Sequence, residues 1–414
     1  MGKKEKPCFF EGGAILSLIR KSRTQKQSEE TLMKIFHLSD LHIGLRLYNR
    51  DLKEDQEAVF KEIADYAAEE QPDAIVIAGD LYDRAVPSAE AVEVFDRFVE
   101  CLTAAAPGAV LMMISGNHDS GPRINCFRGI LARQNLYMIG MPPKRPEDRI
   151  QQVTLFDEHG PVHVYLLPFV RPSMVRETLG AAPEEPLSYE EAVRRLLARE
   201  EIRTEERNVL VSHQFYLPDG TDADAVERMD SEIRTIGNID RVSSSVLEPF
   251  DYAALGHIHK PMKAGEERFC YCGTPLPVSV SEAGQKKGIV VVELGEKGKV
   301  KTRVLPLHPL RQVRIIRGAL EEVLSQACGD YVSILLTDKE DLNVLDMQDR
   351  LRAAFPRLLE IRRETVRRAD YQALPAPVKE LDPFALCCAF LKEADPEEQE
   401  ILRDVINAAG GGAV

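Results

Sequence analysis

The sequence predicts an α/β fold over residues 33 to about 308, in the form of a two-layered sheet sandwich with outer helices. Two observations predict it. Short, largely apolar runs have the length and composition of buried strands, and helix-like segments alternate with them along the chain. Because these runs lack polar alternation, both faces of each strand are expected to be covered. The runs are 34–38, 74–78, 110–114, 209–211 and 252–255.

The remaining elements of this region follow from their residue patterns. Residues 53–69 and 88–102 are helix-like, which predicts two helices outside the sheets. Strand patterns at 288–294 and 299–305 end the region. We therefore expect residues 33–308 to form one unit.

A second pattern begins at Leu310. Strand, helix, strand, helix and strand follow one another at 312–316, 320–328, 332–336, 344–355 and 358–366. This order predicts a small α+β domain over residues 309–370.

The chain from residue 371 onward has the signals of a linker and two short helices. Two prolines within 374–378 disfavour both helix and sheet, so residues 371–381 are expected to form a linker. Asp382 and Asp395 each precede a proline, which is the pattern of an N-cap followed by proline at the first helical position. The resulting helical pair within 382–408 has apolar faces too small to form a core alone. It must dock on this chain or on a partner.

Residues 1–32 do not fit the pattern of the remainder. A lysine-rich start precedes a short apolar stretch broken by Glu11, and residues 20–30 are almost wholly polar. A signal peptide needs an uninterrupted apolar region, and a membrane-spanning helix needs about 20 apolar residues. We expect this segment to be a disordered extension or the product of a misassigned start, and we assign it no function.

Length and composition favour a globular, modular protein. A chain of 414 residues exceeds what one core usually fills, so two or three domains are expected. Hydrophobic residues at 44% and charged residues at 29% indicate no class other than globular. Eight cysteines without a C-x-x-C pair indicate reduced thiols in a cytoplasmic protein. Cys270 and Cys272 alternate along an apparent strand, so packing is favoured over metal binding.

A block of polar side chains follows each of the five apolar runs. Loops beyond the strand ends of open α/β sheets are held rigidly yet stay open to solvent, and ligands commonly bind there. We therefore expect five loops to converge on one point. The blocks are Asp40-Leu-His42, Gly79-Asp80-Leu-Tyr-Asp83, Gly116-Asn117-His118-Asp119, Ser212-His213 and Gly256-His257-Ile-His259.

The residue types in these blocks indicate a pair of metal ions. Carboxylate, amide oxygen and neutral imidazole together suit Mn²⁺, Fe²⁺ or Zn²⁺, whereas an all-oxygen site suits Mg²⁺ or Ca²⁺. Two ions that share a carboxylate can activate water and neutralise charge on both the attacking and leaving oxygens of a phosphoester. Asp80 is the candidate for the shared carboxylate, and metal-assisted phosphoester hydrolysis is the expected reaction.

A structural role is the alternative for any single histidine, because a lone histidine is usually a surface or core residue. Five of the nine histidines fall in the ordered blocks, however, so this alternative requires a repeated coincidence. The other four are interpreted as structural: His37, His159, His163 and His308.

The five blocks resemble those of the calcineurin-like metallophosphoesterases. From Met33 onward the chain is similar to the SbcD-type nucleases of that superfamily, relatives of the Mre nucleases, above all in its opening Met33-Lys-Ile-Phe-His-Leu-Ser-Asp-Leu-His-Ile-Gly. This resemblance implies that His118 is a catalytic residue and not a ligand. It implies one ion held by Asp40, His42, Asp80 and His259, and a second ion held by Asp80, Asn117, His213 and His257.

Asp83 and Arg84 resemble a second group of relatives. Phosphoprotein phosphatases have a similar Gly-Asp-x-x-Asp-Arg block, in which the second aspartate orients the catalytic histidine and the arginine contacts substrate phosphate. Two departures stand against this parallel, because no glycine follows Arg84 within 85–88 and Asp119 replaces a glutamate. Asp83 can equally be a loop cap, and Arg84 a solvated loop residue.

The resemblance implies a function and partners. SbcD-type subunits are Mn²⁺-dependent DNA nucleases, with double-strand 3′–5′ exonuclease and single-strand endonuclease activity at DNA ends and hairpins, and they act in DNA repair, recombination and replication. Their small α+β domain caps the active site, their helical pair docks on the SbcC ATPase, and they form homodimers within a heterotetramer. The implied location is cytoplasmic and nucleoid-associated. This chain has no G-x-x-x-x-G-K-[ST] phosphate loop, so ATP is expected on the partner.

The net charge of −14 is unusual for a protein that acts on DNA. Binding to a polyanion such as DNA must therefore depend on a local basic surface or on a partner. Residues 350–368 contain seven arginines against two glutamates, and Arg350 and Arg352 are the candidate DNA contacts there. A solvated helix face is the alternative interpretation.

Two other functions remain open. One is a phosphodiesterase or phosphatase for a small nucleotide or a phosphoprotein, although such an enzyme has no need of the elements at 310–408. The other is a catalytically inactive scaffold subunit, although every expected ligand is present.

Overall fold

The computed structural model describes residues 32–182, 184–221, 229, 232, 240–338, 344–364 and 398–402. Residues 1–31 of the expected extension at 1–32, and the expected linker at 371–381, lie outside the described residues. Of the expected helical pair at 382–408, only residues 398–402 are described, and they are helical. Below, the body denotes residues 33–308 and the C-terminal unit denotes residues 309–364.

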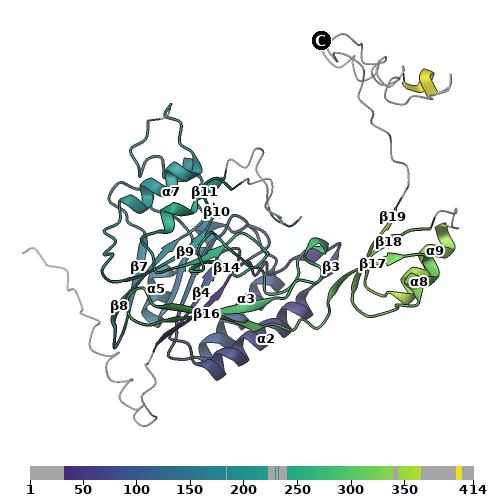
Figure 1. The fold of residues 1–414 in the computed structure, drawn as a ribbon, viewed down its shortest axis with the longest axis horizontal. Helices are drawn as coiled ribbons and strands as arrows, with labels where there is room; N and C mark the ends of the chain where they lie inside the picture. Colours follow the sequence, from purple (N-terminus) through teal and green to yellow (C-terminus); the bar gives the residue numbers. More distant parts are fainter. Residues whose placement is uncertain are drawn as a thin grey trace, which may run out of the picture.

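Two six-stranded sheets form the centre of the body (Figure 1). Strands β1, β4, β5 and β6 are parallel in the first sheet, and β8, β9, β12 and β14 are parallel in the second, while antiparallel strands lie at the edges. The first sheet contains, in spatial order, β16 (Val300–Pro306), β15 (Gly288–Leu294), β1 (Met33–Leu38), β4 (Ala74–Ala78), β5 (Val110–Ile114) and β6 (Leu136–Ile139). The second contains β13 (Met262–Lys263), β14 (Phe269–Tyr271), β12 (Tyr252–Gly256), β9 (Arg207–His213), β8 (Gly160–Leu167) and β7 (Gln151–Asp157).

The two sheets share an inner core, and each has a second core on its outer face. Consecutive residues of a strand point to opposite faces, so Met112 of β5 lies in the inner core while its neighbour Met113 lies in the outer core of the first sheet. Val211 of β9 and Ala254 of β12 complete the inner core from the second sheet. The expected two-layered sandwich is therefore confirmed.

Helices cover both outer faces (Figure 1). α2 (Lys53–Glu70) and α3 (Ala89–Ala105) cover the first sheet, where the Phe60 and Phe98 rings stack at a centroid distance of 4.4 Å. α7 (Tyr189–Ala198) covers the second sheet. Ser88 caps α3 by accepting a hydrogen bond from the Ala91 amide, which fixes where that helix begins. The shorter elements of the body are β2 (Arg46–Leu47), β3 (Arg50–Asp51), α4 (Gly121–Ile124), α5 (Arg128–Leu131), η2 (Ala132–Gln134), α6 (Pro172–Val175), β10 (Phe215–Leu217), β11 (Arg241–Ser243), η5 (Ser244–Leu247) and η6 (Val280–Glu282).

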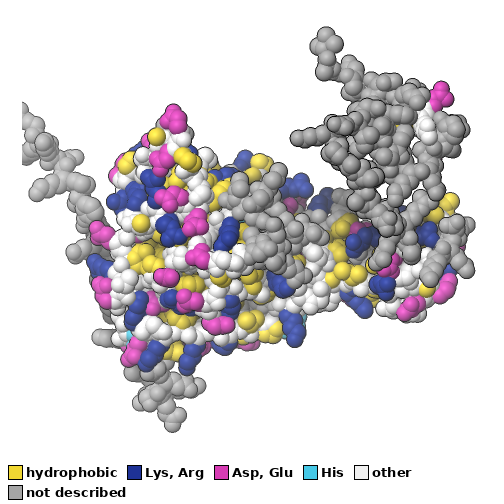
Figure 2. Space-filling view, turned by 45° about the horizontal axis from the view of Figure 1, so that its top comes forward, with side chains coloured by type: hydrophobic (Ala, Val, Ile, Leu, Met, Phe, Trp, Pro, Cys, Tyr) yellow, Lys and Arg dark blue, Asp and Glu magenta, His cyan; other side chains and the backbone are white. Residues whose placement is uncertain are grey.

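Charged side chains of both signs are interspersed over the face of the body in Figure 2. No large field of a single sign stands out on that face among the described residues. Among the described helices, none combines the length and apolar composition needed to cross a membrane.

The C-terminal unit has the five elements expected from its sequence. Its core contains Val323, Ile334, Leu351 and Phe355. All three strands are parallel, so the unit is α/β and not the expected α+β, because parallel neighbours require a crossover and the two helices supply it. The elements are β17 (Val313–Gly318), α8 (Leu320–Leu324), β18 (Tyr331–Leu336), α9 (Val344–Ala354) and β19 (Leu358–Arg363).

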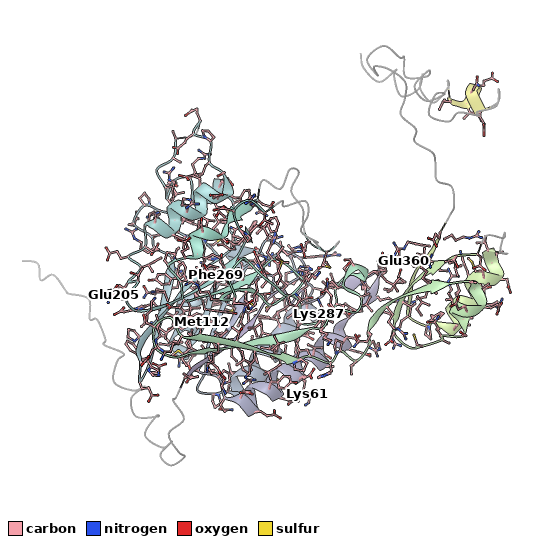
Figure 3. The ribbon with its side chains drawn as sticks, in the orientation of Figure 1. Lys61, Met112, Glu205, Phe269, Lys287 and Glu360 are labelled. Atoms are coloured by element: carbon pink, nitrogen blue, oxygen red, sulfur yellow. The ribbon has the colours of Figure 1, made fainter. Side chains whose placement is uncertain are left out.

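The C-terminal unit is seated on the body through α2 and η6. Val313 and Tyr331 belong to the same hydrophobic core as Leu276 and Val280, which lie just before and in η6. Arg311 and Tyr331 also bind a buried carboxylate on α2. Figure 3 shows Lys287, five residues beyond η6, on the side of the body nearest the C-terminal unit.

Candidate metal centre

The five polar blocks lie at or just beyond the carboxyl ends of β1, β4, β5, β9 and β12. The first three strands are parallel neighbours in one sheet, and the last two are parallel neighbours in the other. Because the carboxyl ends of parallel strands lie at the same sheet edge, all five loops meet at one end of the sandwich. The structure thus brings together every residue expected to bind metal.

Glycines allow these loops to approach one another closely. A Cβ atom on Gly116 would lie 2.1 Å from Asp80 Oδ1, and one on Gly79 would lie 2.3 Å from His213 Nδ1. A Cβ atom on Gly256 would lie 1.9 Å from the Ala78 carbonyl oxygen. These distances are far below van der Waals contact, so even alanine would displace a ligand loop.

The backbone at the site is strained. Asp40, His42, Asp80 and His257 have φ angles of 53°, 43°, 49° and 98°. Non-glycine residues rarely adopt positive φ, which costs on the order of 1–3 kcal/mol each and persists where the surrounding structure enforces it. The strain falls on residues expected to bind metal, which is typical of functional sites.

The first ligand cluster contains two histidines and two aspartates. The Nε2 atoms of His42 and His259 lie 3.1 Å apart. Asp40 Oδ1 lies 3.9 Å from His259 Nε2, and Asp80 Oδ2 lies 3.7 Å from His42 Nε2. These are the four residues expected to hold one ion.

The second ligand cluster is centred on Asn117. Its Oδ1 atom lies 3.0 Å from His213 Nε2 and 2.9 Å from His257 Nδ1. Asp80 Oδ2, which faces the first cluster, also lies 3.3 Å from His213 Nε2. Asp80 is therefore placed between the two clusters, where a shared carboxylate is needed.

Burial shifts the pKa values of several of these groups. It raises the pKa of Asp40 to about 6 and lowers the pKa of His42 well below its usual range. Burial opposes a charged His213, but the Asp80 and Asp40 carboxylates and the hydrogen bond to Ala78 together outweigh it and raise the pKa of His213 to about 9. The His213 ring donates from Nδ1 to the Ala78 carbonyl, which leaves Nε2 directed at Asn117 and Asp80.

The donor set fits two divalent cations. Asp40, Asp80 and the four histidines of the two clusters are all buried, so their charges are poorly screened by water. The Nε2 atoms of His42 and His259 face each other. If both rings present an unprotonated Nε2, the two lone pairs repel each other unless a cation binds them. Carboxylate, amide and imidazole donors without thiolate suit Mn²⁺, Fe²⁺ or Zn²⁺.

His118 lies beside both clusters and is held by the main chain. Its Nδ1–H group donates to the carbonyl oxygen of Asp83 at 2.9 Å, and its amide donates to Asp80 Oδ1 at 2.9 Å. Its ring meets His42 edge to face at a centroid distance of 4.8 Å. A carbonyl can only accept, so Nδ1 carries a proton and Nε2 is the atom left for chemistry.

The carboxylate of Asp83 faces other groups. It lies 3.4 Å from Arg84 Nε and 3.8 Å from His42 Nδ1. The main-chain oxygen of Asp83, and not the expected side chain, therefore makes the hydrogen bond that orients His118.

Asp119 has a role that the sequence alone did not suggest. Its carboxylate accepts hydrogen bonds from the amides of Gly116, Leu81 and Tyr82, at 2.9–3.0 Å. Two ligand loops are joined in this way. In the sequence this residue stood out only as a departure from the glutamate of phosphoprotein phosphatases.

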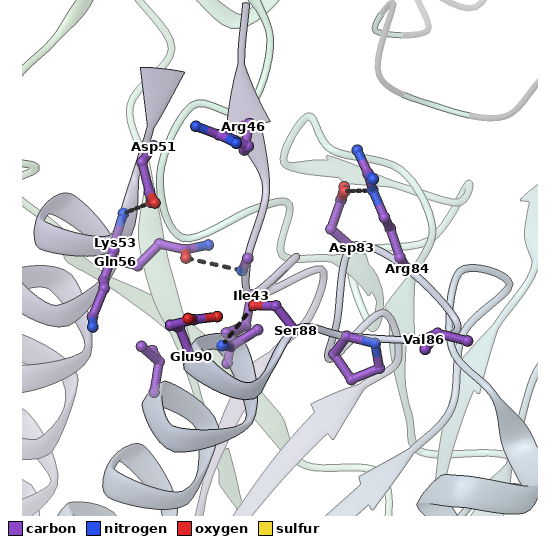
Figure 4. Close-up of a pocket in the computed structure, with 14 residues that line it drawn as sticks. Ile43, Arg46, Asp51, Lys53, Gln56, Asp83, Arg84, Val86, Ser88 and Glu90 are labelled. Atoms are coloured by element: carbon purple, nitrogen blue, oxygen red, sulfur yellow. Dashed lines mark hydrogen bonds and ion pairs between the residues drawn. The ribbon is translucent and has the colours of Figure 1, made fainter. Parts of the chain in front are cut away.

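A cavity of about 650 Å³ adjoins the centre (Figure 4). Asp83 and Arg84 stand on one wall, and Arg46, Asp51 and Lys53 stand on the other. The side chain of Arg84 is 76% exposed, so the structure places it where a substrate can reach it.

A second cavity of about 380 Å³ continues the first toward the C-terminal unit. Asp51 and Lys53 line both cavities. The second is also lined by arginines from the body and from the C-terminal unit, namely Arg50, Arg311 and Arg357.

Arg350 and Arg352, the arginines expected to contact DNA, lie on α9. This helix is on the side of the C-terminal unit that points away from the body (Figure 1). Arg350 pairs with Glu321 at 2.6 Å, and Arg352 lies 3.9 Å from Asp349. The structure therefore separates both residues from the ligand clusters.

A family profile described as calcineurin-like phosphoesterase matches residues 33–261. The chain belongs to this family. Calcineurin-like phosphoesterases use divalent metals, and the matched residues include both ligand clusters, so the chain is a metal-dependent phosphoesterase by family. A second profile, described as a type 5 capsule protein repressor C-terminal domain, matches residues 306–394.

The chain is also similar to curated relatives over most of its length. The SbcD subunit of the SbcCD nuclease of Staphylococcus epidermidis is 29% identical over 338 residues, which is 80% of this chain and 85% of the relative. The SbcD subunit of Staphylococcus saprophyticus subsp. saprophyticus is 29% identical over 340 residues, with the same coverage. Among solved structures, the calcineurin-like phosphoesterase YfkN from Bacillus subtilis is 12% identical with a TM-score of 0.36, and it covers 79% of this chain and 99% of that chain.

Proposed function

We propose that this protein is the Mn²⁺-dependent DNA nuclease subunit of an SbcCD-type complex. The observation that carries the proposal is the position of Asp80 Oδ2, 3.7 Å from His42 Nε2 and 3.3 Å from His213 Nε2. One carboxylate thus faces both ligand clusters, which is the arrangement a two-metal phosphoesterase requires. The name of the relatives, which are subunits of the nuclease SbcCD, gives the substrate class.

Each cluster would hold one ion. When bound, the pair supplies an activated water and neutralises charge on the attacking and leaving oxygens of the phosphodiester. Asp80 would be shared by both ions. Asp40, His42 and His259 would complete one site, and Asn117, His213 and His257 would complete the other.

His118 would be the proton donor. The hydrogen bond from its Nδ1–H group to the Asp83 carbonyl fixes the ring, so Nε2 is the atom directed away from the main chain. From there it would protonate the leaving oxygen of the sugar or stabilise charge on the phosphoryl oxygens. Asp119 would maintain the geometry by joining the loops that carry Asp80 and His118.

The two adjoining cavities support a polymeric substrate. They run from Asp83 beside the ligand clusters to the seat of the C-terminal unit. Their lining contains six cations against four acids, although the chain as a whole carries −14. A phosphodiester backbone would follow this local surface. The six cations are Arg46, Arg50, Lys53, Arg84, Arg311 and Arg357.

The proposed roles of the individual parts of the chain follow from the similarity to the same relatives. We propose residues 33–308 as the nuclease domain, 309–370 as the capping domain and 382–408 as the segment that binds an SbcC-type ATPase. A homodimer within a heterotetramer is the proposed assembly, in the cytoplasm and at the nucleoid. Double-strand exonuclease and single-strand endonuclease activities, in repair, recombination and replication, belong to the same proposal.

A small phosphodiester is the second candidate substrate. The observation that favours it is the mixture of charge signs over the body in Figure 2, which gives little general attraction to a polyanion. An inactive scaffold subunit is not favoured, because all seven expected ligands lie within the two clusters.

The deciding experiment is digestion of linear, hairpin and single-stranded DNA by the full chain with Mn²⁺, with and without an SbcC-type partner. A small phosphodiester is included as a second substrate. Cleavage of DNA that requires Mn²⁺ is the expected result. Turnover of the small phosphodiester alone would favour the second candidate, and no turnover of either, with no bound metal, would favour the scaffold.

A further inference from the structure

Two neighbouring residues of α2 face two different parts of the molecule. Asp55 faces the C-terminal unit, and its Oδ2 atom accepts hydrogen bonds from Arg311 Nη1 and the Tyr331 hydroxyl, both at 2.8 Å. The Asp55 side chain is only 2% exposed, whereas that of Arg311 is 20% exposed at the wall of the second cavity. Burial, together with the hydrogen bond to Asp55, raises the pKa of Tyr331 to about 12, so the hydroxyl stays a donor.

The next residue, Gln56, faces the metal centre. Its Nε2 atom donates to the carbonyl of His42 at 2.9 Å, and its Oε1 atom accepts from the Gly44 amide at 3.2 Å. The loop from Leu41 to Gly44 is thereby held from both sides by one buried amide. His42 has a φ of 43°, a strained angle that needs such a restraint.

The second histidine of the same cluster is held from η6. Glu282 at the end of η6 is fully buried, and its Oε1 atom lies 3.5 Å from His259 Nδ1. Its other oxygen accepts from Thr274 Oγ1 at 2.8 Å and from Lys287 Nζ at 2.6 Å. Burial opposes the Glu282 carboxylate, but Lys287 and His259 together outweigh it and lower the pKa of Glu282 to about 2.

η6 also carries the C-terminal unit. β17 packs against η6, and Val280 of η6 shares a hydrophobic core with Val313 and Tyr331. Both elements that orient the histidines of the first cluster, α2 and η6, are therefore the elements on which the C-terminal unit is seated.

The second cluster is held differently. His213 Nδ1 donates to the Ala78 carbonyl of β4, and Asn117 follows β5, which lies between β4 and the edge strand β6. His257 Nε2 lies 3.9 Å from Asp240 Oδ2. These interactions of the second cluster join residues of the body to one another.

We propose that the seating of the C-terminal unit sets the affinity of one metal site and leaves the other unaffected. Gln56 and Glu282 are positioning residues in this proposal, since they act through the ligands His42 and His259. Displacing the C-terminal unit would relax α2 and η6 and weaken the first cluster only. The proposal rests on the two-metal centre proposed above.

The coupling is reciprocal by thermodynamic necessity. If seating strengthens one metal site, then metal bound at that site strengthens the seating by the same factor. Residues that orient a ligand from behind typically change metal affinity by about 10–100-fold when they are removed. An effect of this order is large enough to resolve one site from the other.

The test uses the full chain and Mn²⁺ alone, titrated in a calorimeter. The combined variant Arg311→Gln and Tyr331→Phe removes both hydrogen bonds to Asp55 without touching a ligand. We expect two binding steps in the wild type and a loss of about tenfold in one step only. Arg303→Gln is the matched control, because Arg303 of β16 pairs at 2.7 Å with Glu70, the last residue of α2, away from the seat.

Ligand variants identify the affected step. It must be the step lost in His42→Asn and kept in His213→Asn. Gln56→Leu should weaken the same step. Below, the seat variant denotes the combined Arg311→Gln and Tyr331→Phe variant. When Gln56→Leu is added to the seat variant, the loss of affinity in that step should be smaller than the two separate losses multiplied together, because both changes act on His42 through α2. Tyr331→Phe alone removes a single oxygen and serves if the combined variant does not fold.

Hydrogen exchange supplies a second readout that does not depend on activity. Mn²⁺ should slow exchange of the β17 and β18 amides in the wild type, and less so in the seat variant. Equal weakening of both steps, or no weakening of either, would overturn the proposal. Failure of the wild type to bind two ions is a different outcome, because it would overturn the proposed metal centre itself.

Discussion

The Nε2 atoms of His42 and His259 lie 3.1 Å apart in the buried end of the sandwich. These residues come from strand ends in different sheets, and the carboxylates of Asp40 and Asp80 lie within 4 Å of them. Two buried rings that face each other with the same atom can be satisfied by one proton or by one shared cation. The nearby carboxylates favour the cation. One of them, Asp80, also faces the second cluster.

Replacing Asp80 by alanine should abolish cleavage of DNA and lower the content of both metals. The change removes ligation but little core volume, so the fold should persist. Metal content by mass spectrometry, together with a nuclease assay, measures the effect. Asp65→Ala is the control, since Asp65 is an exposed acid on α2 that pairs with Lys61. Two bound ions with normal activity in Asp80→Ala would show that this residue is not the shared ligand.

Replacing His118 by asparagine should lower turnover by about 10²–10⁴-fold at saturating Mn²⁺, because a positioned proton donor contributes about that much. Neither ion should be released. His213→Asn, in contrast, should weaken metal binding and recover part of its activity as Mn²⁺ is raised. A Mn²⁺ titration of both variants separates the roles. If His118→Asn is the variant that excess metal rescues, His118 is a ligand.

Replacing Arg50 and Arg357 by glutamine should weaken binding of single-stranded DNA and flatten its dependence on salt. For every phosphate that is no longer neutralised, the slope of log affinity against log salt should decrease by about 0.7. Binding measured by fluorescence anisotropy at several salt concentrations reports this slope. Arg194→Gln on α7, where Arg194 pairs with Glu190, should leave it unchanged. An unchanged slope in the cavity variants would remove the proposed DNA path.

Deleting residues 379–414 should separate partner binding from chemistry. None of the proposed ligands lies in this segment, so Mn²⁺-dependent cleavage of single-stranded DNA should survive. Binding to an SbcC-type ATPase should be lost, which co-purification of the two chains measures. Retention of the ATPase by the truncated chain would place the docking surface elsewhere.

Acid should destabilise the protein partly through His37. This ring is fully buried between the Tyr252 hydroxyl and the Leu255 carbonyl, and burial lowers its pKa to about 3 from the usual 6.5. Between pH 6.5 and about 3, His37 is therefore protonated in the unfolded state and neutral in the folded state. The free energy of unfolding should fall by about 1.4 kcal/mol per pH unit in that window from this residue alone.

Urea unfolding of metal-free protein between pH 4 and 6.5 measures this slope. His37→Gln keeps a donor and an acceptor but cannot be protonated in this range, so its slope should be smaller by about one proton. His308→Gln is the control, since the His308 side chain is 71% exposed. Identical slopes in the wild type and in His37→Gln would contradict the prediction.

The convergence of the seven residues expected to bind metal could be predicted, because their positions follow from local sequence patterns. Each expected ligand lies about two to four residues beyond the end of an apolar run, and parallel strands bring such positions to one edge without any knowledge of loop conformation. The expected runs at 74–78 and 110–114 are β4 and β5 without change, and the expected run at 288–294 is β15. The packing of the two sheets on each other then brings the His257 amide within 3.1 Å of Asp40 Oδ1.

The residues behind the ligands could not be predicted in this way. Gln56 lies in the first turn of a helix and Glu282 in a short 3-10 helix, and neither has a neighbour in sequence that marks a contact with a histidine. Their roles depend on how helices dock on sheets, which has no local signature. The position of Asp83 likewise shows that a motif can supply a main-chain oxygen where a side chain was expected.

The length of the C-terminal unit's first helix was overestimated for a local reason. A helix was expected to Cys328, but α8 ends at Leu324. The Ser325 hydroxyl donates to the Glu322 carbonyl at 2.6 Å and competes with the next helical hydrogen bond. Apolar periodicity does not report such competition.

The two histidines that face each other in the first cluster are 217 residues apart in the chain. Neither ligand cluster exists until both sheets have formed and closed on each other, so metal cannot act as an early nucleus of folding. A chain still emerging from the ribosome would lack a complete second site until His257, and a complete first site until His259, has been synthesised. We therefore expect metal to load only after the two sheets have closed on each other, so a bound ion would report closure of the sandwich.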